Sequence, residues 1–146
     1  MALIYFYDAT ELDVQQLSDG LKETDHDWRY VSDAVSLTNL DPNTEVLSVF
    51  VTSNVTASII DALPKLRLIA CRSTGFNNID LAKADERGIS VVNVPTYGEA
   101  TVAEYTFTLL LALTRKLPQT LRTFDADIHT EELRGNDLSE KTLGVI

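Results

Sequence analysis

Residues 66–80 read LRLIACRSTGFNNID, and this stretch decides which fold the rest of the chain can adopt. Its first part, residues 66–71, is almost continuously apolar, as is typical of a strand buried on both faces of a parallel sheet. Polar and turn-forming residues follow at once, from Arg72 to Asn78. Open α/β sheets bind their ligands at the carboxyl ends of the strands. The stretch therefore predicts a buried parallel strand that leads into a candidate binding loop.

Gly75 is the most informative residue of this loop. Because it has no Cβ atom, it allows either a positive φ or a close approach of the backbone to a ligand. Its amide, together with that of Thr74, can face a small anion. The same residues also fit an ordinary strand-to-helix turn, since single glycines are common in such turns. The spacing alone leaves both interpretations open.

The chain around this stretch alternates strand and helix patterns. We expect strands over residues 2–7, 27–31, 46–52, 66–71 and 89–94, with amphipathic helices between most of them. Pro64 ends one helix, Asp80 caps the next, and Gly88 ends that helix at its C′ position. The alternation predicts an α/β fold with a doubly wound, flavodoxin-like parallel sheet of five strands.

The strongest helical pattern follows this sheet, over residues 101–117. Thr101 and Glu104 fit a capping box at its start. Leucine and aromatic residues spread around most of the helix, so it must be covered on several sides. We expect a second domain or a second subunit to provide that cover. Residues 118–127 then predict a polar helix, residues 131–139 a loop, and residues 142–146 an apolar strand. A terminal apolar strand without a following turn suggests a chain cut inside a longer protein.

The overall composition excludes several classes of partner. A net charge of −10 over 146 residues argues against binding to the phosphate backbone of nucleic acid. The first residues contain no basic leader, and no apolar run is long enough to cross a bilayer, so we expect no membrane partner. Cys71 is the single cysteine and lies in a predicted strand, which favours an inert core thiol. Together these features predict a cytoplasmic protein.

The residues alone support no metal site and no nucleophilic triad. His26 and His129 are far apart in sequence and lie in no ligand-spaced motif. Ser73 lacks the glycine spacing of a nucleophile elbow. A receiver-type signalling domain has a similar layout, but it needs an aspartate pocket, and Asp8 stands alone at the end of the first predicted strand.

Three groups of residues resemble the D-isomer-specific 2-hydroxyacid dehydrogenases, with the D-lactate dehydrogenase branch most similar. They are RSTGFNNID at residues 72–80, NVPTY at 93–97 and VAE at 102–104. The family combines a flavodoxin-like substrate domain with a Rossmann domain that binds NAD, and its members are usually homodimers. The resemblance implies a substrate domain at residues 1–98, followed at 99–146 by the interdomain helix and the start of the NAD-binding domain. Residues 141–146, KTLGVI, resemble the first Rossmann strand, directly before the family's Gly-x-Gly-x-x-Gly loop.

The resemblance also implies roles for four residues. The backbone amides of Thr74 and Gly75 would hold the substrate carboxylate. Tyr97 would line the substrate pocket, although a loop aromatic that shields the core is an equal interpretation. Thr101 would approach the nicotinamide of the cofactor, although capping of its helix also explains it. The family's catalytic His, Arg and Glu have no counterparts in this chain, so no catalytic residue is assigned.

These observations predict the substrate-domain part of an NAD-dependent D-2-hydroxyacid dehydrogenase, inactive by itself. The substrate would be a small 2-keto or 2-hydroxy acid, with pyruvate and D-lactate as one pair and hydroxypyruvate, glyoxylate or a bulkier 2-keto acid as others. The expectation of NAD as the cofactor rests on the family alone, since no residue of this chain distinguishes NAD from NADP. The alternative is a non-catalytic flavodoxin-like binding or regulatory module, since the family resembles corepressors of the same architecture.

Overall fold

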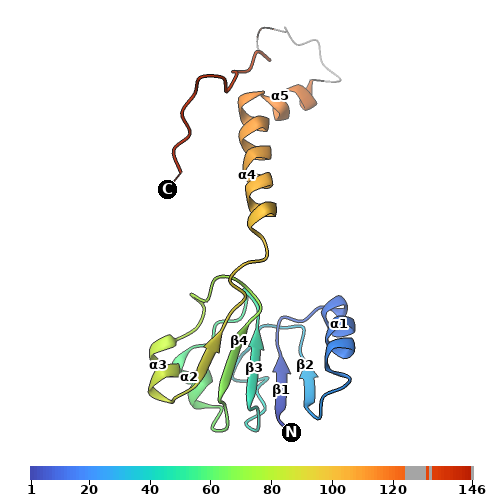
Figure 1. Cartoon of the computed structure of the whole chain (residues 1–146), viewed down its shortest axis with the longest axis vertical. Helices are drawn as coiled ribbons and strands as arrows, with labels where there is room; N and C mark the ends of the chain where they lie inside the picture. Colours follow the sequence, from blue (N-terminus) through green and yellow to red (C-terminus); the bar gives the residue numbers. More distant parts are fainter. Residues whose placement is uncertain (124–130, 132, 146) are drawn as a thin grey trace. The chain divides into compact units, whose positions relative to one another are not determined.

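The computed structural model describes residues 1–123, 131 and 133–145. The chain divides into two compact units, Met1–Tyr97 and Gly98–Ile146. The first unit contains a parallel sheet of five strands in the order β2-β1-β3-β4-β5, with helices on both faces (Figure 1). This order is the flavodoxin-like one, in which the chain reverses direction across the sheet between β1 and β3. The predicted α/β fold is confirmed.

The five strands are each shorter than the sequence pattern predicts. They are β1 (Leu3–Phe6), β2 (Asp27–Tyr30), β3 (Val46–Val49), β4 (Leu68–Cys71) and β5 (Ser90–Val92). All four neighbouring pairs are parallel. The carboxyl ends of all five strands therefore lie along one edge of the sheet.

Local hydrogen bonds define where the helices of the first unit begin and end. They are α1 (Glu11–Leu21), α2 (Ala57–Asp61) and α3 (Leu81–Glu86). Thr10 and Asp13 form a capping box at the start of α1. The Asp80 carboxylate caps α3 as predicted, since it accepts a hydrogen bond of 3.0 Å from the Lys83 amide. Gly88 then takes a φ of 65°, the left-handed conformation that ends a helix at little cost for glycine.

Two apolar clusters hold the helices against the two faces of the sheet. The larger cluster joins α2 and α3 to the sheet and includes Leu47, Ile60 and Ile69, all fully buried. The smaller cluster lies under α1 and contains Ile4 and Phe6, which alternate with the residues that face the larger cluster. Cys71 belongs to the larger cluster, and burial raises the pKa of its thiol, as expected for an inert core cysteine.

The second unit contains α4 (Glu99–Thr114) and α5 (Leu117–Arg122). The predicted capping box at Thr101 and Glu104 is wrong, because the N-cap lies three residues earlier, at Gly98. Gly98 is the N-cap, and its carbonyl accepts the first intrahelical bond, 2.8 Å from the Val102 amide. Sequence reasoning placed the start too late because the match to the capping pattern outweighed the helix-compatible residues Glu99 and Ala100.

The predicted strand at residues 142–146 is not formed over residues 142–145, and residue 146 lies outside the described part of the chain. A strand needs a partner for its backbone hydrogen bonds, and no other strand lies in the described residues of the second unit. The predicted polar helix at 118–127 corresponds to α5, while residues 124–127 lie outside the described part. The described residues of 131–139 form neither helix nor strand, as predicted.

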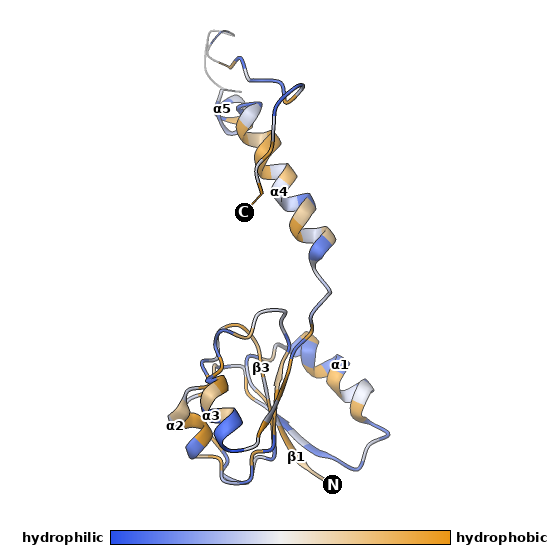
Figure 2. Cartoon of the chain, turned by 60° about the vertical axis from the view of Figure 1, so that its left-hand side comes forward, coloured by the Kyte–Doolittle hydropathy of each residue, from blue (hydrophilic) through white to orange (hydrophobic). Residues whose placement is uncertain are grey.

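No residue of α4 is buried, although the helix is mostly apolar. Figure 2 shows hydrophobic residues in orange along much of its length. The large exposed side chains include Tyr105, Phe107 and Leu113, the last of which is 74% exposed. Among the described residues, no helix is both long and apolar enough to cross a membrane.

We predict that Asp80→Ala lowers the free energy of unfolding by about 1 kcal/mol, because it removes the side-chain cap of α3. Asp85→Ala is the matched control, since Asp85 is an exposed acidic residue of the same helix. Urea unfolding followed by circular dichroism measures both variants. Equal midpoints for the two would contradict the capping role.

Candidate anion-binding turn at the carboxyl ends of the strands

The loop after β4 lies at the edge of the sheet where the strands end. Ser73 is buried, whereas Thr74, Gly75 and Phe76 are exposed, so the chain leaves the core at this point. The loop after β5 lies beside it, because the Val94 amide donates a hydrogen bond of 3.1 Å to the Ser73 carbonyl. The most exposed part of the polar loop is therefore the turn at Thr74 and Gly75.

The carbonyls of this turn are bonded to the protein, but its amides are not. The Asn93 side-chain amide donates to the Thr74 carbonyl at 2.8 Å, and the Ser73 hydroxyl donates to the Gly75 carbonyl at 2.7 Å. No acceptor among the described residues pairs with the N–H groups of Thr74 or Gly75. Two neighbouring free amides in an exposed turn form a suitable site for a small anion.

Gly75 does not use the conformational freedom that its residue type offers. Among the described residues Gly88 is the glycine with a positive φ, so Gly75 does not adopt the first of the two alternatives that its residue type allows. A Cβ atom built on Gly75 would meet nothing within 4 Å. The contacts within the protein therefore do not require glycine at this position, and close approach of the backbone to a ligand stays a prediction.

Arg72 supplies the positive charge nearest in sequence to the turn. Its guanidinium donates to the carbonyls of Tyr7 at 2.8 Å and Asp8 at 3.0 Å, and to the Ser48 hydroxyl at 3.1 Å. Burial of the side chain lowers the pKa of the Arg72 guanidinium from its usual value. No carboxylate within the described residues forms an ion pair with it.

In the sequence, Arg72 is one of several polar residues of the loop and the first residue of the RSTGFNNID stretch, and no binding role is assigned to it. Its position directly after a buried strand was the available signal, because a cation there must find partners at the sheet edge. The carbonyls of Tyr7 and Asp8 provide those partners, and these residues follow β1, 65 and 64 residues earlier in the chain. Which acceptors Arg72 reaches depends on the strand order, which the residue pattern alone does not give.

The other two predicted site residues lie apart from this turn in the chain. Tyr97 ends the first unit and is 63% exposed, so it does not shield the core of that unit. Thr101 belongs to the second unit, where it lies exposed in the first turn of α4. The roles of Thr74, Gly75, Tyr97 and Thr101 in substrate or cofactor binding stay predictions.

Among the described residues, the one histidine, His26, does not lie at the turn. His26 lies at the amino ends of the strands, where its Nδ1 accepts a hydrogen bond of 3.2 Å from the Ala2 amide. His129 lies outside the described residues. The described part of the chain contains no cluster of His, Cys, Asp and Glu that could hold a metal ion.

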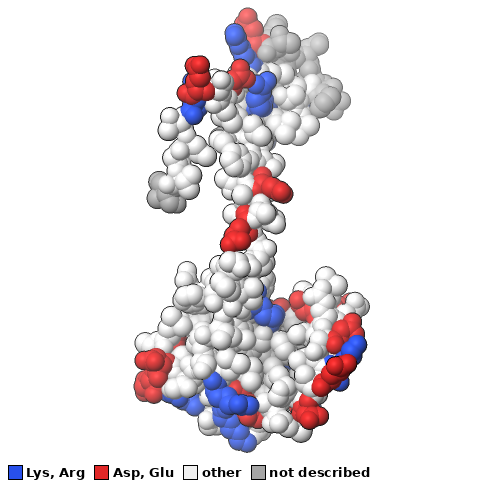
Figure 3. Space-filling view, in the orientation of Figure 1, with Lys and Arg blue, Asp and Glu red and all other residues white. Residues whose placement is uncertain are grey.

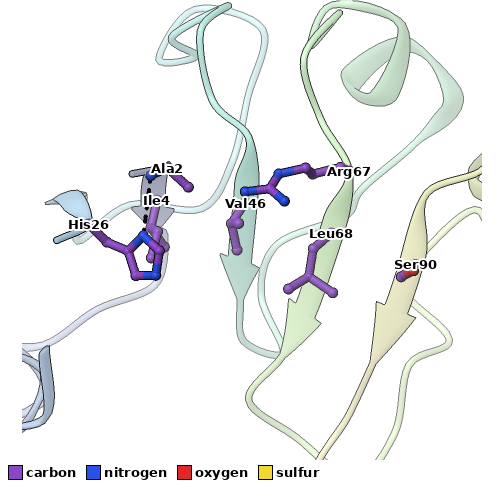
Figure 4. A pocket seen from close by; sticks show the side chains of 7 residues that line it. All are labelled: Ala2, Ile4, His26, Val46, Arg67, Leu68 and Ser90. Carbon is purple, nitrogen blue, oxygen red and sulfur yellow. Dashed lines mark hydrogen bonds between the residues drawn. The ribbon is translucent and has the colours of Figure 1, made fainter. Parts of the chain in front are cut away.

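A pocket of about 560 Å³ opens at the amino ends of the strands, at the opposite edge of the sheet from the turn (Figure 4). Its lining includes the first or second residue of four strands, because the register aligns these residues across the sheet. The lining residues are Ala2, Ile4, His26, Val46, Arg67, Leu68 and Ser90. Ligands of open α/β sheets bind at the opposite ends of the strands, so the turn at Thr74 and Gly75 remains the candidate site.

Charged side chains are scattered over the molecule. Figure 3 shows basic side chains interspersed with acidic ones on the visible face of the first unit, without an extended basic surface. Such a surface is what a nucleic-acid backbone requires. The acidic balance of the chain, −10 overall, agrees with this view.

Comparison with known proteins decides the family. The family model described as D-isomer specific 2-hydroxyacid dehydrogenase, catalytic domain, matches residues 4–140. The chain belongs to this family. The members of this family are oxidoreductases. The matched residues include the RSTGFNNID stretch and almost all of the five-stranded parallel sheet of this chain.

Individual relatives agree with this assignment. A 2-hydroxyacid dehydrogenase homolog 1 of Schizosaccharomyces pombe is 44% identical over 104 residues, which cover 69% of this chain and 31% of the relative. D-lactate dehydrogenase of Escherichia coli is 37% identical over 105 residues, covering 70% of this chain and 32% of that enzyme. This chain thus spans about a third of the length of these relatives.

A solved structure supports the fold. The D-lactate dehydrogenase of Aquifex aeolicus, in complex with NAD and lactic acid, superposes with a TM-score of 0.77 at 27% identity. The match covers 92% of this chain and 41% of that one. The sheet described above therefore has the arrangement found in a dehydrogenase of this family.

Proposed function

We propose that this chain is the substrate-binding part of a dehydrogenase that interconverts a small 2-keto acid and the D-2-hydroxy acid. Pyruvate and D-lactate are the proposed pair. The observation that carries the proposal is the pair of unpaired amides at Thr74 and Gly75, exposed at the carboxyl ends of the strands. A 2-keto acid offers a carboxylate of the size that two adjacent amides can bind.

The geometry of the turn favours a compact anion. The two amides bind through the backbone, and the Arg72 guanidinium adds positive charge at the same edge of the sheet. A glycine at the second position leaves open space where a side chain would otherwise meet the ligand. Tyr97 is proposed to line the same pocket.

Reduction of a 2-keto acid also needs a hydride and a proton. NAD supplies or accepts the hydride when it is bound, and an NAD complex of a relative supports its use. The six glycines of this chain have no Gly-x-Gly-x-x-Gly spacing, so the chain by itself offers no phosphate loop for the pyrophosphate. Thr101 is the residue that we propose to approach the nicotinamide in a longer protein.

The proton donor is likewise not found at the turn. His26 lies at the opposite ends of the strands, and no other described histidine exists. We therefore propose that this chain binds the substrate without converting it. That same observation favours the second candidate function, a binding module that recognises a carboxylate and carries out no reaction.

The apolar helix α4 suggests how the chain associates. Tyr105, Phe107, Leu109 and Leu113 are each more than half exposed. Such a surface is rarely left open to water in a monomer. We propose that a homodimer covers it, as a single sheet face cannot enclose a helix that is apolar on several sides.

We predict that pyruvate shifts the amide signals of Thr74 and Gly75 in the NMR spectrum of the labelled chain. Gly75→Ala keeps the amide and meets no neighbouring atom, so it should fold normally but weaken pyruvate binding about tenfold. Gly20→Ala is the control, because its Cβ also meets nothing within 4 Å and it lies in α1. Equal binding by both variants would show that pyruvate does not approach Gly75.

We predict that the purified 146-residue chain does not oxidise NADH in the presence of pyruvate. The expected rate equals that of a reaction without protein, since the described residues offer neither a phosphate loop nor a proton donor at the turn. NADH absorbance measures the rate. Turnover that co-purifies with the chain would contradict the proposed division between binding and catalysis.

We predict that the chain self-associates in a concentration-dependent manner and that Phe107→Lys shifts the equilibrium toward the monomer. The added charge interrupts the apolar surface of α4, where Phe107 is 53% exposed. Thr106→Lys adds the same charge at a neighbouring exposed polar position and serves as the control. Light scattering over a range of concentrations measures the mass, and a monomer at every concentration would refute the homodimer.

A further inference from the structure

Asp8 has an unusual backbone conformation at the end of β1. Its φ is 54°, and it is one of three non-glycine residues with a positive φ among the described residues. This region is unfavourable for most residues and is occupied where surrounding contacts hold the chain in place. The Asp8 amide donates to the Asp33 carbonyl at 3.2 Å, which is one such contact.

The Asp8 carboxylate joins the end of β1 to the loop after β3. One oxygen accepts a hydrogen bond of 2.9 Å from the Phe50 amide, and the other accepts one of 2.5 Å from the Thr52 hydroxyl. The residue that stood alone in the sequence thus has two partners more than 40 residues away. Phe50 and Thr52 follow β3, the strand at the centre of the sheet.

The main chain of Asp8 joins the same position to the strand before the anion-binding turn. Its carbonyl accepts a hydrogen bond of 3.0 Å from Arg72, which also bonds to the Tyr7 carbonyl at 2.8 Å. Arg72 directly precedes Ser73 and the turn at Thr74 and Gly75. Asp8 therefore contacts the residue from which the turn departs.

The far side of the turn is tied to the same group of residues. The Asn78 side chain donates to the Phe50 carbonyl at 3.0 Å and to the Ser53 carbonyl at 2.7 Å. Phe50 is thus held by Asp8 through its amide and by Asn78 through its carbonyl. The turn lies between Arg72 and Asn78. Arg72 is hydrogen-bonded to Asp8 directly, and Asn78 is connected to Asp8 through Phe50.

We propose that Asp8 is a positioning residue for the anion-binding turn. It fixes the loops after β1, β3 and β4 relative to one another and so holds the amides of Thr74 and Gly75 in the orientation that binds a carboxylate. This inference rests on the proposed function for the identity of the ligand, but not for the geometry of the turn. Asp8 itself does not contact the ligand in this role.

The direction in which replacement of Asp8 changes the affinity for an anion distinguishes a positioning role from a purely electrostatic one. Asp8 carries a negative charge, so its removal alone would strengthen the binding of an anion. Loss of positioning has the opposite effect, because the two amides no longer face the carboxylate together. A weaker affinity after removal of a negative charge is therefore a result that electrostatics does not produce.

The experiment compares Asp8→Gly and Asp8→Asn with wild type by NMR titration with pyruvate at constant ionic strength. Glycine tolerates the positive φ and lacks both carboxylate bonds, while asparagine tolerates it and keeps one acceptor oxygen. We expect the pyruvate Kd to rise about three- to tenfold in Asp8→Gly and less in Asp8→Asn. Asp19→Asn, at an exposed position of α1, removes the same charge and should leave the Kd unchanged or slightly lower.

A second readout needs no ligand. In Asp8→Gly we expect shifted Thr74 and Gly75 amide signals and faster hydrogen exchange at Phe50, while the thermal midpoint stays close to that of wild type. If wild type does not bind pyruvate but these changes occur, the proposed function fails and the positioning role stands. Unchanged Thr74 and Gly75 signals, or a Kd in the Asp8 variants equal to that of Asp19→Asn, would overturn the inference.

Discussion

The parallel pairing of β3 with β1 on one side and β4 on the other is the interaction on which the rest of the first unit depends. Leu47 and Val49 of β3 are fully buried, and Leu47 is paired with Tyr5 of β1 on one side and Ile69 of β4 on the other. Strands that run in the same direction must end at the same edge of the sheet. The loops that follow β1, β3, β4 and β5 are therefore brought together by the core, although their residues are distant in the chain.

Beyond the ends of the strands, hydrogen bonds from side chains connect the loops, whereas within the sheet backbone hydrogen bonds connect the strands. Polar groups in the loops still need partners, since an unpaired buried N–H or C=O is costly. Arg72, Asn78 and Asn93 satisfy carbonyls of neighbouring loops, and Asp8 accepts from an amide and a hydroxyl. The amides of Thr74 and Gly75 are left out of this network, and this is the observation on which the proposed binding of a carboxylate rests.

The second unit follows a different physical rule. Its long helix α4 forms through local hydrogen bonds, which need no partner surface. Its apolar side chains remain exposed, and none is buried within the described part of the chain. In contrast to the sheet, which encloses its own core, this helix gains no stability from a buried apolar face within the described residues.

Local residue patterns predicted the five strands of the sheet, the helices between them and the position of the candidate turn, but also a strand at residues 142–146 that is not formed over residues 142–145. Apolar runs of the right length, Asp80 at a helix start and Gly88 at a helix end are local signals, and each keeps its meaning in the folded chain. The stretch from Arg72 to Asp80 likewise marked the family, because its residue order is specific. The folded structure shows which residues, distant in the chain, lie side by side at the ends of the strands. The partners of Asp8 and the contacts of Arg72 depend on which strand ends meet, and no local residue pattern encodes a contact between positions more than 40 residues apart.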